Sequence, residues 1–454
     1  MPILPQSGDR PGTRRDDTAV LAPTRQARNR GRTEDRSGSP RRTQGNTLLC
    51  VANSYRQILA VPGSASFVMA GFVGRLPISM VSLGIVLLVV ARTGSYALAG
   101  FMSAAYALAA AFLGPFGARF IDRHGQHRIV PVLAISQIVF LLAFVAASSL
   151  GLPVVLQFLL LVLSGGTSPN VGSLVRARWA YALRGDISVR TAFALEAIVD
   201  EIVFIAGPPL VTVVALQISE PAALALCAVL IAIGTIWLAL LRSSQPHPTG
   251  KLPIGSAGRV LSAGMAAVVA TMALMGAIFG CFEVTTVAYA QEADAADLTG
   301  WLLALYATGS LLSGVVVGAV QFSRPTAVQL PVFATALAVV ALPLPFVPNT
   351  GVLALTIFIA GMAVSPVLIS CATLVEELVP TARLTEAMTL TISGIAVGLA
   401  LGSTLSGFLV DTAGAKHGYW VMTLSSLLAA ALTWLVRGPL IRATFRAGSS
   451  ERPV

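Results

Sequence analysis

Charged residues are what this sequence has least of: Asp, Glu, Lys and Arg make up 11% of its 454 residues, while 55% are hydrophobic. Soluble domains typically carry about 25% charged residues. The charge is also unevenly placed, since eleven of the 30 Lys and Arg residues lie in the first 60 positions. The rest of the chain is poorer still in charge, which excludes a soluble globular protein and predicts an integral membrane protein.

Cysteine is also scarce, and the four residues Cys50, Cys227, Cys281 and Cys371 stand singly. The last three lie in apolar runs without CxxC spacing or a neighbouring His, which favours buried small residues over disulfides or metal ligands. The sequence lacks a Walker loop, a metal-ligand cluster and Ser-His-Asp spacing. We therefore expect no enzyme activity, no cofactor, no metal site and no ATP-driven step.

Residues 1–60 are rich in Arg, Pro, Gly, Ser and Thr and hold few large apolar residues. Such a segment buries too little surface to offset its ordering entropy, so we expect a disordered basic cytoplasmic tail. It has no continuous apolar region, and this excludes a secretory signal. The tail either contacts anionic lipid or is dispensable.

Twelve apolar runs follow, each long enough for a bilayer that needs about 20 apolar residues. They predict an all-α membrane protein with twelve transmembrane helices in two six-helix bundles, 61–241 and 260–440. A Pro-, Gly- and Ser-rich linker, 242–259, joins the bundles, and 441–454 form a second cytoplasmic tail. The runs are 66–91, 95–116, 129–150, 152–175, 191–216, 221–241, 260–289, 299–320, 327–347, 351–375, 385–410 and 418–437.

The positions of Lys and Arg predict the orientation. If the amino terminus is inside, sixteen of the Lys and Arg residues after the tail fall in cytoplasmic connections, and only Arg92 and Lys416 face the other side. The positive-inside rule then places both termini in the cytoplasm. The net charge of +10 would indicate nucleic acid in a soluble protein, but here we expect no nucleic-acid partner.

A weak internal repeat favours duplication of a six-helix unit, the arrangement that many transporters use. The matches fall on the second and fourth helices of each half. The matching positions are Tyr106 with Tyr306, Gly114 with Gly314, and Ser168-Pro169 with Ser365-Pro366.

Residues 117–128 are the first dense cluster of charge after the tail, and they lie between the second and third runs. We expect a short, basic, turn-forming loop there. Its core, Asp122-Arg123-x-Gly125, resembles the Gly-x-x-x-Asp-Arg/Lys-x-Gly-x-Arg/Lys-Arg/Lys pattern of major facilitator superfamily transporters. With the helix count and the central linker, the resemblance covers about residues 65–440, and it implies alternating access between two six-helix halves.

This loop departs from the family pattern at some positions. Ala118 stands where the family has Gly, Gln126 and His127 replace basic residues, and Arg128 keeps a positive charge. The resemblance implies that Asp122 meets the start of the eleventh helix and stabilises the outward-facing state, which suits a carboxylate near a helix amino terminus. The alternative is a solvated loop whose charge only sets the topology.

Gly207-Pro208 in the fifth helix resembles the Gly-Pro signature of proton-driven drug antiporters in the same family. A simple kink is the alternative interpretation, because Pro is tolerated in membrane helices. The resemblance also implies that the fourth and tenth helices line a central cavity. Pro169 with Asn170, and Ser365 with Pro366, are therefore candidate cavity-lining residues.

Charged residues within the apolar runs mark candidate sites, because a charge facing lipid costs about 2.5–3.5 kcal/mol or more. Arg75 in the first helix and Asp200 or Glu201 in the fifth lie at similar depth, and Glu196 shares a helical face with Asp200. Three interpretations stay open. Protonation breaks an Arg75–carboxylate pair and couples protons to transport, or the pair is a static salt bridge, or the acids are exposed to water and have no partner.

Glu283 in the seventh helix has no obvious basic partner in its half of the sequence. It either faces the cavity and binds a cation or proton, or it is a protonated structural residue. By contrast, Gly394, Gly398 and Gly402 recur every four residues in the eleventh helix, which predicts close helix packing.

These features together predict a secondary active transporter, with proton-coupled export of a small apolar or cationic compound as the favoured function. A transporter of a polar metabolite such as a sugar, and a non-transporting membrane sensor or scaffold, are the alternatives. We expect a monomer in the inner (plasma) membrane whose partners are the lipid bilayer, protons and a small-molecule substrate.

Overall fold

The computed structural model describes residues 56–183, 188–246, 262–319, 324–379 and 384–450. These residues form helices and no strand, and twelve of the helical segments are long and apolar enough to cross a membrane. The predicted fold class is therefore confirmed. Most of the predicted tail at 1–60 and of the predicted linker at 242–259 lies outside the described residues.

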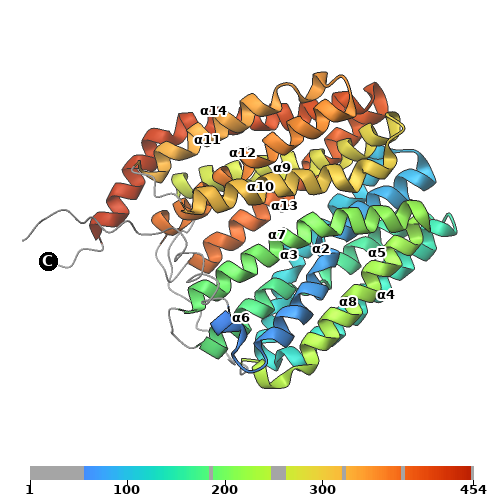
Figure 1. The fold of residues 1–454 in the computed structure, drawn as a ribbon, viewed down its shortest axis with the longest axis horizontal. Helices are drawn as coiled ribbons and strands as arrows, with labels where there is room; N and C mark the ends of the chain where they lie inside the picture. Colours follow the sequence, from blue (N-terminus) through green and yellow to red (C-terminus); the bar gives the residue numbers. More distant parts are fainter. Residues whose placement is uncertain (1–55, 184–187, 247–261, 320–323, 380–383, 451–454) are drawn as a thin grey trace, which may run out of the picture. The chain divides into compact units, whose positions relative to one another are not determined.

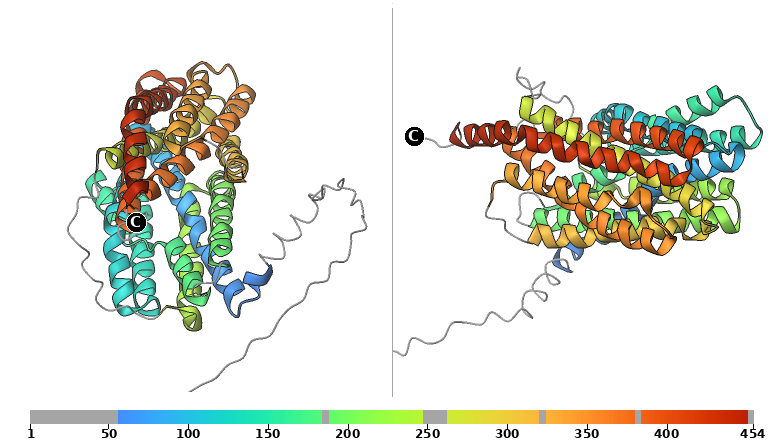
Figure 2. Two further views of the ribbon diagram at one scale, coloured as in Figure 1. Left: turned by 90° about the vertical axis from the view of Figure 1, so that its left-hand side faces the viewer. Right: turned by 90° about the horizontal axis from the view of Figure 1, so that it is seen from above.

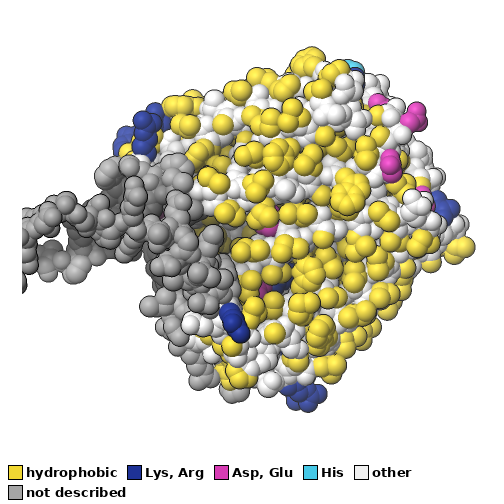
Figure 3. All heavy atoms as spheres, viewed as in Figure 1, with side chains coloured by type: hydrophobic (Ala, Val, Ile, Leu, Met, Phe, Trp, Pro, Cys, Tyr) yellow, Lys and Arg dark blue, Asp and Glu magenta, His cyan; other side chains and the backbone are white. Residues whose placement is uncertain are grey.

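The helices form two bundles, one from each half of the chain (Figures 1 and 2). The space-filling view shows a broad hydrophobic surface, with most of its charged side chains near the two ends of the helices (Figure 3). The first bundle contains α2 (Ser64–Thr93), α3 (Tyr96–His124), α4 (Gln126–Ser149), α5 (Val154–Gly166), α6 (Val171–Leu183), α7 (Ser188–Gln217) and α8 (Glu220–Leu240). The second contains α9 (Ala263–Glu292), α10 (Thr299–Ala319), α11 (Thr326–Ala341), α12 (Thr350–Leu378), α13 (Leu384–Ala413) and α14 (Ala415–Ser450).

The predicted loop at 117–128 is wrong in extent, because α3 continues to His124 and α4 starts at Gln126. Only Gly125 forms the turn, with a φ of 89° that favours glycine. Its N–H donates to the carbonyl of Ile121 and closes the helix. The charged residues before it have adequate helix propensity, so the cluster of charge marks a helix end and not a long loop.

The predicted run at 152–175 also differs, because it contains a break. Helix α5 ends at Gly166 and α6 starts at Val171, with Pro169 between them. Proline has no N–H to continue the helical ladder, and Asn170 restarts it by accepting the N–H of Ser173 at 3.0 Å. Helix α6 then extends to Leu183, well beyond the predicted end.

Glycines bring α9 and α13 close together. A Cβ on Gly398 would lie 1.7 Å from the carbonyl oxygen of Ala273, and one on Gly402 would lie 2.1 Å from that of Ala277. Gly280 of α9 packs against the backbone of Leu399 in the same way. This close approach agrees with the packing expected from the glycine spacing.

The two bundles repeat one helix contact. Gly165 of α5 packs on the carbonyl of Tyr106 in α3, and Gly361 of α12 packs on the carbonyl of Tyr306 in α10. Both contacts require glycine, which has no Cβ. A Cβ on Gly165 would lie 2.2 Å from the carbonyl oxygen of Tyr106, and one on Gly361 would lie 2.1 Å from that of Tyr306. The match between Tyr106 and Tyr306 in the sequence therefore reflects equivalent packing.

Arg178 of α6 is fully buried and ties the end of the first bundle together. Its guanidinium donates to the side chain of Gln126 in α4, to the carbonyl oxygens of Leu238 and Leu241, and to the hydroxyl of Ser244. The carbonyl oxygens at the end of α8 carry the partial negative charge of a helix carboxyl terminus. They stabilise this cation in place of a carboxylate.

Candidate functional site

A cluster of charged side chains joins α2 to α7 inside the first bundle. The guanidinium of Arg75 donates through Nη1 to Oδ1 of Asp200 at 2.9 Å and through Nη2 to Oε2 of Glu196. The side chains of Arg75 and Glu196 are 1% and 0% exposed. The structure thus brings together three of the charged residues that the sequence singled out.

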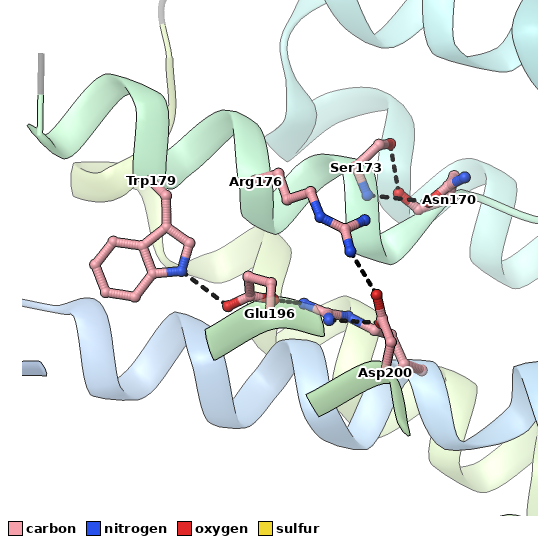
Figure 4. A network of polar contacts seen from close by, with 7 residues as sticks. Asn170, Ser173, Arg176, Trp179, Glu196 and Asp200 are labelled. Carbon is pink, nitrogen blue, oxygen red and sulfur yellow. Dashed lines mark hydrogen bonds and ion pairs between the residues drawn. The ribbon is translucent and has the colours of Figure 1, made fainter. Parts of the chain in front are cut away.

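Helix α6 adds two residues that the sequence analysis did not select (Figure 4). Arg176 donates through Nη2 to Oδ2 of Asp200 at 2.5 Å, and Trp179 donates its indole N–H to Oε1 of Glu196 at 2.8 Å. The sequence analysis missed both residues because the predicted helix ended at residue 175, which placed Arg176 and Trp179 in the connection after it. Arg176 and Trp179 are three residues apart on a helix that restarts after Pro169, so they share one helical face, which lies toward α7. This spacing is the signal by which the sequence could have indicated them.

The two carboxylates differ in their surroundings. Glu196 is enclosed and holds bonds from Arg75 and Trp179, whereas the side chain of Asp200 is 33% exposed and lies between Arg75 and Arg176. Two cations and two anions leave the cluster without net charge, which makes its burial tolerable. Glu201 is half-buried and forms no ion pair within the described part of the chain.

Glu283 lies where the second bundle meets the first. Its Oε2 accepts the hydroxyl of Ser82 in α2 at 3.1 Å, and Ser82 shares a second hydrogen bond with Ser103 of α3 at 2.6 Å. Its Oε1 is buried and has no hydrogen-bond partner among the described residues, and the same holds for the hydroxyl of Tyr306. The rings of Phe282 and Tyr306 stack, with their centroids 4.1 Å apart.

Residues 268–452 match the model of the Major Facilitator Superfamily. The solved nucleoside transporter NupG is 14% identical, with a TM-score of 0.65 over 84% of this chain and 99% of that one. A peptide transporter, POT, solved with sulfate is 15% identical, with a TM-score of 0.64 over 87% and 99%. The chain has the fold of a major facilitator transporter.

Another neighbour with this fold is a POT family transporter solved with 5-aminolevulinic acid, at 12% identity, a TM-score of 0.66, and coverage of 84% and 96%. No curated protein matches the chain. The family match points to a transporter and not to an enzyme. Neither comparison supports the drug efflux branch that the sequence indicated. The protein is a multi-pass membrane protein, while its placement in the inner membrane stays a prediction.

The two halves of the major facilitator fold pack closely at one end. Gly100 of α3 lies on the backbone of Ser403 in α13, and Gly300 of α10 lies on Pro208 and Pro209 of α7. Helix α7 runs from Ser188 to Gln217 through both prolines. Gly207 lets α7 approach Ser79 of α2, because a Cβ there would lie 1.9 Å from the Ser79 hydroxyl.

Asp411 closes this end further by capping the amino terminus of α3. Its carboxylate accepts the N–H groups of Tyr96 at 2.8 Å and Ala97 at 2.9 Å, and the hydroxyl of Ser95 at 2.8 Å. Tyr96 also donates its hydroxyl to Gln291 of α9 at 2.6 Å. The positive end of the α3 dipole favours this carboxylate. By the predicted topology, this is the outer end of the transporter.

At the opposite end of α3, Asp122, Arg123 and Arg128 are exposed. Asp122 has no hydrogen-bond or ion-pair partner among the described residues, and the residues just before α13, 380–383, lie outside them. The contact that the resemblance implies for Asp122 therefore stays a prediction. Asp122 lines a cavity of about 390 Å³ together with Gly125, Pro169 and other residues of α3, α4 and α6.

The remaining cavity candidates have different surroundings. Asn170 is exposed and lines the same cavity as Asp122. Ser365 is buried and shares a hydrogen bond with Ser310 of α10 at 2.8 Å, and Pro366 is buried beside it. Ser365 thus ties α12 to α10, while Asn170 stands at the break between α5 and α6.

Proposed function

We propose that the protein is a proton-coupled secondary transporter of a small polar molecule, with Asp200 as the coupling carboxylate. The observation that carries this proposal is the different exposure of the two acids that share Arg75. Asp200 is open to solvent on one side and bridges two arginines, while Glu196 is fixed by Arg75 and Trp179. A proton can therefore reach Asp200 and release both of its ion pairs.

The release of Asp200 changes the contacts between three helices. Arg75, Arg176 and Asp200 belong to α2, α6 and α7, so neutralising Asp200 removes the ion pair between α6 and α7 and one of the two ion pairs between α2 and α7. A coupling ion must favour one arrangement of the helices over the other. The neighbours of the same fold transport nucleosides and peptides, and this supports a polar substrate.

Transport in liposomes tests the proposal. Purified protein is reconstituted, a proton gradient is imposed, and accumulation of labelled nucleosides, dipeptides and amino acids is measured with and without a protonophore. We expect accumulation that the protonophore abolishes. Asp200→Asn should lose accumulation but keep exchange of substrate down its own gradient, because the ion pairs are already weakened.

The matched control is Asp297→Asn, the same substitution at an exposed aspartate in the short helix Ala296–Leu298. This variant should transport like the wild type. Accumulation by Asp200→Asn at the wild-type level would refute the coupling role, and Glu283→Gln then becomes the next variant to measure.

Export of a cationic compound is the second candidate function. The buried Oε1 of Glu283, which has no hydrogen-bond partner among the described residues, favours it because a carboxylate oxygen there can accept an ammonium group. Proton-driven accumulation of a fluorescent lipophilic cation in inside-out vesicles tests this candidate. Loss of that accumulation in Glu283→Gln would support it, and no accumulation in the wild type would reject it.

A further inference from the structure

The cavity of about 390 Å³ that Asp122 lines has the size of a small-molecule site, for which about 300–1,000 Å³ is usual. By the predicted topology it lies at the cytoplasmic ends of the helices. The described residues that line it belong to α3, α4, α6, the end of α5 and the segment after α8, and none belongs to the second bundle. The cluster around Arg75 does not line it either. The cavity is therefore separate from the proposed coupling site.

Small residues of α3 make this hollow. Gly114, Gly117 and Ala118 all line the cavity, and their spacing of three and four residues places them on one helical face. Nothing lies within 4 Å of a Cβ added to Gly114. Another wall is the break between α5 and α6, where Pro169 interrupts the helix. Irregular backbone at membrane depth is tolerated where it lines a cavity.

Among the described residues, the carboxylate of Asp122 is the one charged group that lines the cavity. It is exposed and forms no ion pair within the described ranges. Arg119, one helical turn earlier, is held over an aromatic ring instead, with its guanidinium carbon 5.5 Å from the ring centroid of Phe116. Arg123 and Arg128 do not line the cavity. Asp122 is thus available to a ligand, and it favours a cation.

The backbone around the cavity offers little to an anion. Helices α4 and α6 begin at its wall, but donors at both amino termini are already engaged. The N–H of Ser173 donates to Asn170 at 3.0 Å, and the N–H of His127 donates to the side chain of Gln245 at 3.1 Å. Helix α5 ends at the cavity with Gly166, and the carboxyl terminus of a helix carries a partial negative charge. This end of α5 also favours a cation.

Gln126 adds a polar donor to the wall of the cavity. Its side chain belongs to a residue that is 4% exposed, and its Oε1 accepts the Nε–H of Arg178 at 2.9 Å. This bond fixes which end of the amide is the oxygen. The NH₂ group has no hydrogen-bond partner among the residues described, and protein atoms do not seal it off. A ligand oxygen that accepts from this group would satisfy it.

These groups define the chemistry of a ligand. Asp122 suits an ammonium group, since a charge-assisted hydrogen bond to a carboxylate is among the strong ones. Gln126 suits a hydroxyl oxygen, and Ile121, Leu133 and Leu174 provide apolar surface for a hydrocarbon body. We propose that this cavity binds a small organic amine that carries a hydroxyl group on an apolar body.

Occupation of the cavity acts on transport through α6. Ser173 and Ala177 of this helix line the cavity, while Arg176 and Trp179 of the same helix bind the carboxylates of α7 (Figure 4). A ligand that contacts α3, α4 and α6 together favours the arrangement of helices in which the cavity exists. The amine is therefore a regulator that slows transport. This regulation rests on the proposed function, whereas the binding site does not.

Binding to the purified full chain in neutral detergent tests the site. The probe is phenylethanolamine at neutral pH, where its amine is protonated; phenethylamine lacks the hydroxyl, and styrene glycol replaces the amine by a hydroxyl. Thermal unfolding reports binding, because a ligand that binds the folded state raises the unfolding temperature. We expect the affinity for phenylethanolamine to exceed that for styrene glycol about 10- to 100-fold and that for phenethylamine about 2- to 10-fold, as expected for a charged and a neutral hydrogen bond.

Two variants assign the binding to this cavity. Asp122→Asn should lose at least tenfold in affinity for phenylethanolamine and bind it no better than styrene glycol. Gly114→Leu should also lose at least tenfold, because its side chain enters the hollow, and the open space around its Cβ lets the protein fold. Gly438→Leu in α14 is the matched control, since its Cβ also meets nothing within 4 Å and Gly438 does not line the cavity. This control should bind like the wild type.

Equal binding of phenylethanolamine by the wild type, Asp122→Asn and Gly114→Leu would mean partition into detergent and would overturn the site. Equal affinity of the wild type for phenylethanolamine and styrene glycol would overturn the role of Asp122. The headgroup of phosphatidylethanolamine carries the same ammonium group, and titrations in nanodiscs with and without this lipid distinguish the two sources. Loss of phenylethanolamine binding when the lipid is present would assign the site to the lipid headgroup and reject a soluble regulator.

Substrate exchange in liposomes tests the regulation. Phenylethanolamine should lower the maximal rate of exchange at least twofold and leave KM unchanged, and Gly114→Leu should resist it, each protein being compared with its own rate without the amine. Competitive inhibition would mean that the amine is a substrate and would overturn the separate site. Binding that depends on Asp122 and Gly114, without transport of any labelled compound, would retain the site and reject the proposed function.

Discussion

The cap that Asp411 places on α3 should set the balance between the two states of the transporter. Asp411→Ala removes three hydrogen bonds and a charge at a helix amino terminus. Loss of a helix cap costs about 1 kcal/mol, and a charge at the dipole adds about 0.3–1 kcal/mol. Because Asp411 is exposed, we take a total of about 1–2 kcal/mol, a shift of about 5- to 30-fold toward opening at this end.

Distances between spin labels measure this shift. Labels are placed on cysteines at Arg92 and Thr412, both exposed near the closed end, after Cys50 is replaced by Ser. The other three cysteines are buried and free, which keeps the background of labelling low. We expect the wild type to show mainly short distances and Asp411→Ala to populate a longer one.

Glu292→Ala is the matched control. Its carboxylate accepts the N–H of Ala415 at 2.8 Å and so caps α14, the same chemistry within one bundle. Its removal should lower the unfolding temperature slightly and leave the distances unchanged. Identical distance distributions in Asp411→Ala and the wild type would refute the reasoning, as would an equal shift in Glu292→Ala.

Two further variants test the packing and the charge cluster. Gly398→Val should destabilise the protein by more than the usual range of about 1–3 kcal/mol for overpacking, because its Cβ would meet the carbonyl of Ala273. Gly438→Ala is the control, since nothing lies within 4 Å of a Cβ added there. Thermal unfolding in detergent compares the two variants, and equal stability would contradict the packing. Trp179→Phe should lower the free energy of unfolding by about 1–3 kcal/mol, because one buried oxygen of Glu196 then lacks its hydrogen-bond donor. Unfolding by denaturant measures this difference. An unchanged stability would mean that another donor replaces the indole.

Hydrophobicity alone predicted the twelve helices, because a bilayer requires long apolar segments whatever their tertiary contacts. It predicted Gly125 as part of a turn but placed the turn over residues 117–128, since it took a charged segment for a loop. The helix in fact continues through Asp122. Charge at the end of a membrane helix and charge in a loop look alike in a sequence.

The charge cluster was predicted in part. Arg75 and Asp200 attract attention because they interrupt apolar runs, and their matching depth indicated that they meet. Arg176 and Trp179 do not interrupt such a run, and only the restart of the helix after Pro169 brings them to Asp200 and Glu196. Asp411 was missed because its partner is a helix terminus far along the chain, which no local pattern records.

The buried arginines also constrain how the nascent chain assembles in the membrane. Arg178 finds its carbonyl partners 60 and 63 residues later in the chain, and Arg75 finds Glu196 only 121 residues later. Until α7 and α8 have been inserted, Arg75 lacks both of its carboxylates, and Arg178 lacks every one of its acceptors except Gln126 of α4. The first bundle therefore becomes stable only when its last helix arrives, so substitutions at the end of α8 should act by exposing the unfinished protein to membrane proteases.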